Sequence, residues 1–304
     1  MRHLFIINKH AGKGGAWADI VSQLEKYKGD KSFELHYTTA KGDAATFSRE
    51  YVKNSGEFVR VYACGGDGTL NEVINGVYDL ENCAVAPVPI GSGNDFIRSF
   101  SADKKEYLDI DNLINARDRK IDLLKCGDRI SANSITVGFD CAVAKNVEKF
   151  KKRRFISASL AYKLSIFYCL FKERRHGFSV TLDGEKQKAD NTYLLSICAK
   201  GKYYGGGIKC APLADNADGY IDFTLVTTVG VLKFIVMLST FTKGKHINNP
   251  KLDFVSHKKV KSVVYENPEP FEIGIDGEIF TVRKAEIELL KDRLKIIIPE
   301  NDKG

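Results

Sequence analysis

The sequence predicts an α/β N-terminal domain followed by a β-rich, sandwich-like C-terminal domain. The first third of the chain alternates short apolar runs with segments of helical periodicity, which is typical of strands and helices around a mostly parallel sheet. Beyond about Lys125, alternating strand-like runs prevail and helical patterns become fewer. At 304 residues the chain is also longer than one hydrophobic core usually supports, so we expect two cores.

The elements of the first domain follow in order. Residues 4–7 form an apolar run that predicts a buried strand, and a polar turn follows at 8–14. The next apolar residues recur at the spacing of a helix with one face toward the core: Trp17, Ile20, Val21, Leu24 and Tyr27. Residues 58–64 and 84–90 predict two further strands, the second despite Pro87 and Pro89.

Both of these strands end in glycine turns. The first turn is Gly65, Gly66, Asp67, Gly68 and Thr69, and apolar residues at helical spacing follow it at Leu70, Val73, Ile74 and Val77. The second turn occupies residues 91–95. Because parallel strands end at the same edge of a sheet, we expect the two turns to meet there.

In the second domain we expect strands at 178–182, 193–198, 220–226 and 258–265. Helical patterns occur at 142–171 and 229–243. We therefore assign residues 1–126 to the α/β domain and residues 127–292 to the β-rich domain. The final apolar run leads us to expect that residues 293–300 return to the first domain.

Composition excludes several classes of protein. Hydrophobic residues make up 43% and charged residues 28%, close to globular averages, so we do not expect disorder. The seven cysteines are odd in number and form no CxxC pair, which argues against disulfides and zinc. The apolar run near the N-terminus is too short for a signal peptide, so we expect a cytoplasmic protein. There is no HExxH, GxSxG or GxxxxGK[ST] motif.

Two apolar stretches, 155–171 and 229–241, are interrupted by Lys163 and Lys233. Neither reaches the roughly 20 apolar residues that a spanning helix needs, so we expect no transmembrane segment. A net charge of +7 is modest for this length, and we expect no nucleic-acid partner. The densest basic cluster fits either a solvated helix end or contact with anionic lipid headgroups, and composition leaves both open: Lys149, Lys151, Lys152, Arg153 and Arg154.

The first glycine turn has the chemistry of a phosphate site. Backbone N–H groups at a helix N-terminus, near the positive end of its dipole, suit a phosphate chain. Glycine turns also serve simple chain reversal, and Asp67 favours the functional interpretation. A carboxylate beside phosphates calls for Mg²⁺ or a hydroxyl donor between them, and phosphoryl transfer requires such positioning and charge neutralisation.

Residues 65–76 resemble the nucleotide-binding signature of the diacylglycerol kinase catalytic family, within which the bacterial soluble lipid kinases are most similar. The resemblance continues in order through residues 89–96, 119–122 and 275–278. It implies an ATP site between the two domains, with the phosphates on the loops at 8–12 and 65–71. Lys9 departs from the family pattern, which has proline at that position. Lys13 fits a phosphate contact or a solvated loop lysine equally well.

By matching position, the resemblance implies a set of nucleotide-binding residues: Asn8, Ala11, Gly12, Thr39, Gly65, Gly66, Asp67, Gly68, Thr69, Leu70, Asn71 and Ser92. It also implies that Asp67 and Glu278 are catalytic, with Glu278 as the general base that takes the proton from the acceptor hydroxyl. From the residues alone, the Asp-Gly-Glu tripeptide ending at Glu278 favours a hairpin turn over a catalytic role. The second copy, Asp183, Gly184 and Glu185, reads as an ordinary exposed hairpin turn.

Residues 212–222 pack several oxygen ligands around a glycine, a pattern that suits Mg²⁺ or an Asx-rich turn. The resemblance implies a Mg²⁺ held by Asp215, Asp218 and the Leu213 carbonyl, set back from the phosphates. Asp95 and Asp122 also match the family, and we expect them either to anchor a Mg²⁺ and water network or to have a core or capping role.

We therefore expect a kinase that uses ATP and Mg²⁺ to phosphorylate a lipid hydroxyl at a membrane surface, with diacylglycerol giving phosphatidic acid as the first substrate to test. Peripheral contact with the inner face of the membrane would follow. A kinase of the NAD kinase type and a non-catalytic lipid-binding homologue are the alternatives. The sequence names neither the acceptor lipid nor the oligomeric state, a homodimer being one option.

Overall fold

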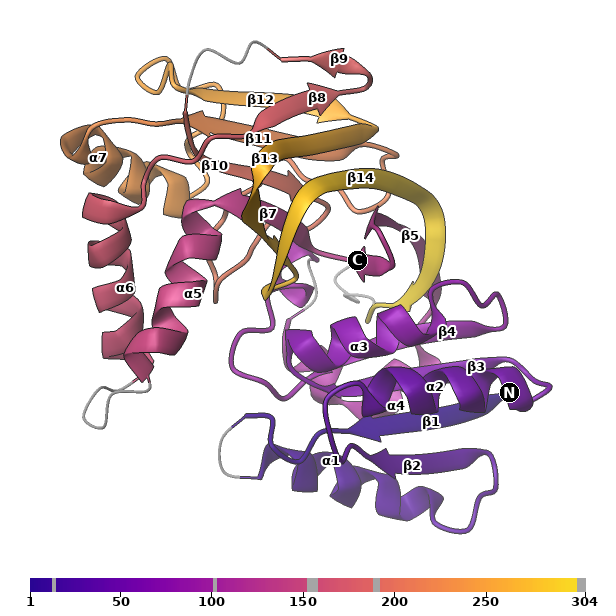
Figure 1. Ribbon diagram of the computed structural model, residues 1–304. Helices are drawn as coiled ribbons and strands as arrows, with labels where there is room; N and C mark the ends of the chain where they lie inside the picture. Colours follow the sequence, from indigo (N-terminus) through magenta and orange to yellow (C-terminus); the bar gives the residue numbers. More distant parts are fainter. Residues whose placement is uncertain (13–14, 101–102, 152–157, 188–191, 300–304) are drawn as a thin grey trace. The chain divides into compact units, whose positions relative to one another are not determined.

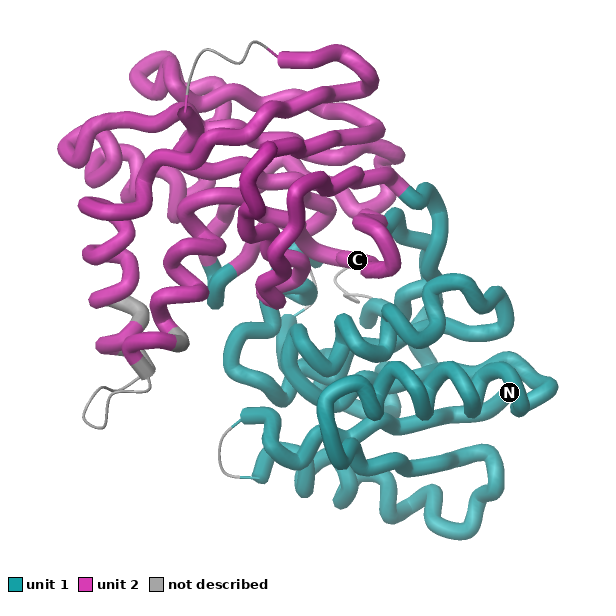
Figure 2. The backbone as a smooth tube through the Cα atoms, viewed as in Figure 1, with its two compact units in different colours: residues 1–123, 205–207, 290–304 teal, residues 124–204, 208–289 magenta. Residues whose placement is uncertain are grey.

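The computed structural model describes residues 1–12, 15–100, 103–151, 158–187 and 192–299. The chain divides into two compact units, drawn teal and magenta in Figure 2. Unit 1 comprises residues 1–123, 205–207 and 290–304, and unit 2 comprises residues 124–204 and 208–289. The first four strands of the chain, all in unit 1, pair in parallel, whereas the strands within unit 2 pair antiparallel. The predicted fold class, an α/β domain followed by a β-rich sandwich-like domain, is confirmed.

Unit 1 is built on a parallel sheet with strand order β14-β4-β3-β1-β2, in which β14 contributes only its last residues. Its first elements alternate in the predicted way (Figure 1): β1 (Arg2–Ile7), α1 (Ala16–Leu24), β2 (Phe33–Tyr37), α2 (Asp43–Asn54), β3 (Val59–Gly65), α3 (Asp67–Val77) and β4 (Cys83–Pro89). The short helix α4 (Ile110–Asn115) and β5 (Asp118–Cys126) follow. Ile296 in β14 lies opposite Val85 in β4.

Strands β1, β3 and β4 are buried almost throughout, as continuous apolar runs require when helices cover a parallel sheet, whereas the edge strand β2 has no buried residue. Phe5 and Tyr62 stack across β1 and β3 with ring centroids 4.2 Å apart. Gly76 lets α3 approach α2 closely, because a side chain there would overlap the carbonyl oxygen of Ala45. The sheet and these two helices therefore form a rigid support for the loops at the strand ends.

Unit 2 is antiparallel, with strand order β12-β11-β10-β7-β13-β14 and with β8 paired to β13. Its elements in chain order are β6 (Arg129–Ser131), β7 (Ser134–Gly138), α5 (Phe139–Lys151), α6 (Ala158–Lys172), β8 (Ser179–Leu182), β9 (Glu185–Lys186), β10 (Tyr193–Ala199), β11 (Ile221–Thr227), α7 (Val231–Thr242), β12 (Val255–Val260), β13 (Ser262–Ile275) and β14 (Glu278–Ile297). The C-terminal part of β13 pairs with β7 and its N-terminal part with β8.

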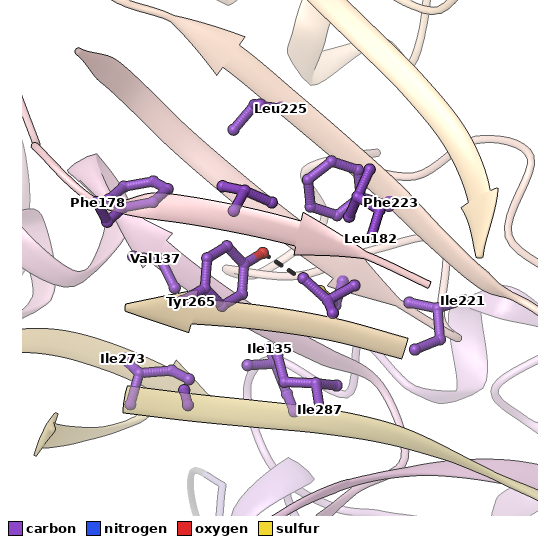
Figure 3. Packing of buried hydrophobic residues seen from close by; sticks show 14 of the residues in the cluster. Ile135, Val137, Phe178, Leu182, Ile221, Phe223, Leu225, Tyr265, Ile273 and Ile287 are labelled. Carbon is purple, nitrogen blue, oxygen red and sulfur yellow. Dashed lines mark hydrogen bonds between the residues drawn. The ribbon is translucent and has the colours of Figure 1, made fainter. Parts of the chain in front are cut away.

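The core of unit 2 lies among these strands. Figure 3 shows Tyr265 of β13 among apolar side chains from β7, β8, β11 and β14. The Tyr265 hydroxyl, buried with no exposed surface, lies 2.7 Å from Ser196 Oγ, which satisfies both polar groups inside the core. A second cluster of buried residues joins α5, α6 and α7 to β10.

One strand differs from its prediction. Residues 258–265 read as a single strand, whereas β12 ends at Val260 and β13 begins at Ser262. The backbone N–H groups of Lys261 and Ser262 each donate to the Asp183 carboxylate at 2.8 Å instead of to a neighbouring strand. These two backbone N–H groups therefore keep hydrogen-bond acceptors where the chain passes from β12 to β13.

Candidate functional site

Four loops of unit 1 begin at one edge of its sheet. Strands β1 to β4 are parallel, so the segments that follow them lie at the same edge: Asn8 after β1, Thr39 after β2, Gly66 after β3 and Gly91 after β4. This edge, at the carboxyl ends of parallel strands, is where open α/β sheets usually bind ligands. The predicted meeting of the two glycine turns is thus found in the structure.

The two turns touch through backbone. Gly91 N donates to Gly65 O at 3.1 Å. A Cβ on Gly91 would overlap the Cα of Gly66 and lie 2.9 Å from its nitrogen, so no larger residue fits without moving the chain. Gly12 makes a similar approach to the carbonyl oxygen of Ile90 and has a φ of 78°, which glycine adopts without strain. Glycine is required here by contact, beyond its use in tight turns.

Asn8 and Thr69 connect the first loop to the start of α3. Asn8 Nδ2 donates to Thr69 Oγ1 at 3.1 Å, and Asn8 Oδ1 accepts from His10 N at 3.0 Å. Thr69 is buried, and its hydroxyl packs so close to Gly65 that a side chain on Gly65 would overlap it. These two side chains hold the loops in shape, which leaves phosphate recognition to backbone groups.

The N-terminus of α3 is open for an anion. Its N-cap is Gly66, and no side chain caps the first turn. Gly68 is exposed, with no atom within 4 Å of the place where its Cβ would be. Since the first N–H groups of a helix have no partner within the helix, Asp67, Gly68 and Thr69 present donors that suit a phosphate group.

Two carboxylates accompany these donors. Asp67 Oδ1 accepts from Phe96 N at 3.2 Å, and Asp95 Oδ2 accepts from Gly206 N at 2.7 Å. Burial, together with the charge of Asp95, raises the pKa of Asp67. Asp95 Oδ1 is buried without a hydrogen-bond partner, although the Arg98 Nε lies 3.4 Å away. Oxygens with unused capacity beside a phosphate site fit a hydrated Mg²⁺ that accompanies a nucleotide.

The remaining predicted nucleotide residues lie at the same edge or near it. Thr39 is exposed, and its N and Oγ1 both donate to Asp43 Oδ2, at 2.7 and 2.9 Å. Those hydrogen bonds, the backbone one first, lower the pKa of Asp43. Ser92 is exposed on the second turn, and Asn71 accepts from Asn75 Nδ2 within α3. Ala11 lies in the loop after β1, three residues beyond Asn8, and Leu70 lies in α3 next to Thr69. Lys13 lies outside the described residues.

In unit 2, Glu278 begins β14 directly after a two-residue hairpin turn. Ile275 pairs with Glu278 across the turn, and Asp276 and Gly277 have φ values of 44° and 88°. The Asp276 carboxylate accepts hydrogen bonds from Ser131 Oγ and from the backbone N–H groups of residues 132, 133 and 134, at 2.6 to 3.2 Å. The turn that carries the half-buried Glu278 is therefore held in one conformation.

In the loop predicted to bind a metal ion, two lysine ammonium groups contact the Asp218 carboxylate. Asp218 Oδ1 accepts from Lys200 Nζ at 2.9 Å, and its Oδ2 pairs with the Lys259 ammonium. Burial acts to raise the pKa of Asp218, but the Lys259 and Lys200 ammoniums outweigh it and lower that pKa. Lys200 is fully buried and also donates to Tyr220 O at 2.6 Å. As arranged, these residues do not fit Mg²⁺, because two ammoniums occupy the carboxylate that would bind it.

The other predicted ligands of this loop do not form a cage either. Asp215 and Leu213 are exposed, and Asp215 Oδ1 accepts from Ala217 N at 2.9 Å, as in an Asx turn. Across the part of the chain that the structure describes, no group of three or more His, Cys, Asp or Glu side chains could hold a metal ion. Asp122 is buried and accepts from Asp292 N at 2.9 Å, which ties β5 to β14.

Sequence reasoning assigned no structural role to three residues that shape these sites. Asn94 donates through Nδ2 to Gly91 O at 2.6 Å and has a φ of 53°, a conformation that asparagine tolerates. Its position in a Gly-Ser-Gly-Asn turn was a usable signal. Asp276 was named only as part of a hairpin, and Lys200 had no signal at all, because its partner Asp218 is 18 residues away in a loop.

Residues 2–126 match the family model described as the diacylglycerol kinase catalytic domain, and residues 133–298 match the YegS C-terminal NAD kinase beta sandwich-like domain. A Bacillus subtilis protein provisionally described as the lipid kinase YtlR is 29% identical over 292 residues, covering 90% of this chain and 92% of that protein. A Bacillus subtilis diacylglycerol kinase is 27% identical, with 98% and 97% covered.

Among solved structures, a diacylglycerol kinase from Bacillus anthracis str. Sterne superposes with a TM-score of 0.71 at 23% identity, covering 97% of this chain and 96% of that one. This similarity extends the shared fold over both units. In the described residues, no helix is long and apolar enough to cross a membrane.

Proposed function

The chain belongs to the family with a diacylglycerol kinase catalytic domain and a YegS-type C-terminal domain, and on that premise we propose that it transfers the γ-phosphate of ATP to a lipid hydroxyl. Diacylglycerol, which would give phosphatidic acid, is the acceptor we propose first. Mg²⁺ would enter with ATP and shield the phosphate charge. The observation that carries the proposal is the contact between the two glycine turns beside Asp67 and the open N-terminus of α3.

Each residue set would have a distinct role. Backbone N–H groups of Asp67, Gly68 and Thr69 would bind the phosphate chain, because they lie where a helix N-terminus attracts anions. Asn8 would hold the first loop against Thr69 and so preserve the distance between the turns. Asp67 would orient the hydrated cation that ATP brings. Glu278 would accept the proton of the lipid hydroxyl, which makes that oxygen a better nucleophile.

The direct test of the proposal is a transfer assay with γ-labelled ATP and a panel of acceptors. Mixed micelles would present diacylglycerol, phosphatidylglycerol, a sphingoid base or a polyprenol, and NAD would be supplied in solution. We expect label in phosphatidic acid and none in NADP. Label in NADP would favour the NAD kinase type of activity, which the description of the C-terminal domain makes the main alternative. Absence of ATP turnover with every acceptor in the panel would favour a non-catalytic lipid-binding protein.

Glu278→Gln tests the proposed base. General base catalysis is typically worth about 10²- to 10⁴-fold, so we expect kcat to fall by at least the lower figure. Binding of a fluorescent ATP analogue should stay near normal, because glutamine has the same size as glutamate and Glu278 is not among the groups proposed to donate hydrogen bonds to the phosphates.

The second Asp-Gly-Glu hairpin provides a matched control. Glu185 occupies the same place in the β8–β9 turn, where Leu182 pairs with Glu185, and it is exposed. Glu185→Gln should therefore leave kcat unchanged. A Glu278→Gln protein with a normal rate, or equal losses in both variants, would remove Glu278 from the mechanism.

A further inference from the structure

The exposed apolar side chains of this protein are concentrated on two helices of unit 2. Eleven large hydrophobic side chains are exposed among the described residues, and five of them lie on α6 and three on α7. Most side chains of this kind are scattered singly on soluble proteins, whereas concentrated ones mark interaction surfaces. We define the apolar ridge as these eight residues: Leu160, Leu164, Phe167, Tyr168, Phe171, Leu232, Ile235 and Val236.

On α7 the ridge is a second apolar face. Phe234, Met237 and Phe241 are buried against the core, as expected for one side of an amphipathic helix. The opposite side carries Leu232 and Val236, which are 81% and 67% exposed. A helix that faced only water there would be expected to carry polar residues at those positions.

On α6 the exposed residues fall at helical spacing along one stripe. Leu160, Leu164, Phe167 and Phe171 are separated by four, three and four positions, so they share a face. Phe167 is 65% exposed, while Ala161, Ser165 and Cys169 on the other side are buried. Both helices contribute to the same cluster of buried residues, and Figure 1 shows them on one side of unit 2.

The charged residues within the two ridge helices are all lysines. Neither α6 nor α7 contains an acidic residue. Residues 231–251 contain four lysines, Lys233, Lys243, Lys245 and Lys251, all exposed, and no carboxylate. Such a surface would bring like charges together in a two-fold dimer of this chain, which disfavours a second copy as its partner. An anionic bilayer offers both an apolar interior and a negative surface.

We propose that the apolar ridge docks the protein on an anionic lipid bilayer. The side chains of Leu232, Val236 and Phe167 enter the boundary between headgroups and acyl chains, and the lysines beside them contact lipid phosphates. This inference rests on the proposed lipid kinase function for its biological purpose, because docking would place the chain at the surface where its acceptor resides. The predicted basic cluster at 149–154 stays a sequence-based expectation, because residues 152–157 lie outside the described part of the chain.

The test is flotation of the full chain with vesicles in the absence of ATP, so that binding is scored separately from kinase activity. Vesicles of phosphatidylcholine alone are compared with vesicles in which about a third of the lipid is phosphatidylglycerol. We expect binding to the anionic vesicles, weakened by salt because screening reduces the electrostatic part. Leu232→Ser with Val236→Ser, and separately Phe167→Ser with Phe171→Ser, should each lower the partition coefficient roughly tenfold or more.

Controls separate docking from folding and from loss of charge. Leu232→Met with Val236→Ile keeps the ridge apolar and should bind like the wild type. Lys243→Gln with Lys245→Gln should weaken binding to anionic vesicles roughly tenfold, whereas Lys31→Gln with Lys53→Gln removes two exposed lysines from unit 1 and should not.

Two outcomes would overturn the proposal. The first is vesicle binding that both serine variants retain at the wild-type level. The second is a wild-type dimer in light scattering that the Leu232→Ser, Val236→Ser variant converts to monomer, since the ridge would then be an interface between copies. Absence of kinase activity with vesicle binding intact would refute the proposed function and leave the docking surface standing.

Discussion

At the scale of single residues, carboxylates of this protein fix loop shape by accepting hydrogen bonds from backbone N–H groups. Asp276 accepts three such bonds at the turn before Glu278, and Asp183 accepts two where β12 gives way to β13. A charged acceptor makes these hydrogen bonds stronger than neutral ones. The two Asp-Gly-Glu tripeptides thus use their aspartates alike, while the surroundings of Glu278 and Glu185 differ.

His246 gives a pH dependence of stability at this scale. It is 1% exposed, its Nε2 lies 3.0 Å from Cys210 O, and burial lowers its pKa to about 4. At pH values between about 4 and 6.5, the ordinary pKa of histidine, the unfolded chain binds more protons at this histidine than the folded chain does. Its contribution to stability is therefore complete above about pH 6.5 and is lost as the pH falls toward 4.

His246→Gln checks this prediction by chemical denaturation at pH 7.5 and pH 5. Glutamine can donate to Cys210 O but does not titrate, so the stability gap between wild type and variant should narrow by about 2 kcal/mol at the lower pH. His10→Gln alters an exposed histidine and should show the same gap at both values. An unchanged gap for His246→Gln would show that the folded chain binds a proton at this histidine as readily as the unfolded chain does, so that burial does not lower its pKa.

At the scale of elements, the strand-turn-helix units of unit 1 depend on glycine where two turns meet. The parallel register sets β3 beside β4, from Val59 opposite Cys83 to Gly65 opposite Pro89, so their following turns must come together. The sequence contains both glycine turns, but their mutual contact follows from strand order, which depends on how the whole sheet assembles. Gly91 is thus constrained by Gly66 as much as by its own turn.

Gly91→Ala tests that contact. Its Cβ would meet the backbone of Gly66, which cannot rotate away as a side chain could, so we expect a loss of about 1–3 kcal/mol in unfolding free energy. ATP binding should weaken as well. Gly68→Ala is the matched comparison for stability without nucleotide: it lies in α3 with no neighbouring atom within 4 Å, and alanine there should add roughly 0.5–1 kcal/mol. Equal effects of the two substitutions would contradict the argument.

At the scale of the whole molecule, charge pairs join segments that are distant in the chain. Lys200 at the end of β10 and Lys259 in β12 both reach Asp218, in the loop before β11. Removing one partner of a buried ion pair is costly, about 3–5 kcal/mol, because the other charge is left without compensation. The loop is thus held by ammoniums of the protein itself, at the position where a bound cation was expected.

Chelation tests this arrangement on the full chain. We expect the Tm of the nucleotide-free protein to be the same with EDTA and with Mg²⁺, because the two lysines supply the positive charge at Asp218. Lys200→Met should lower the unfolding free energy by about 3 kcal/mol. A Tm that falls by several degrees when Mg²⁺ is removed from the wild type would show that a metal ion holds the loop after all.

The sequence by itself determined the fold class, the strand-turn-helix units and the glycine turns. Local periodicity and glycine positions express backbone preferences that need no tertiary context. The same local information identified Asp67, because it lies within the turn it serves.

Only the tertiary structure decided how these pieces combine. It decided that Gly91 presses on Gly66, that Asp276 anchors the turn of Glu278, that lysines occupy Asp218, and that α7 carries a second apolar face. Each of these depends on contacts between residues far apart in the chain, on strand order, or on which face of a helix is covered. The physical reason is that burial and pairing are properties of the assembled chain, which no local pattern encodes.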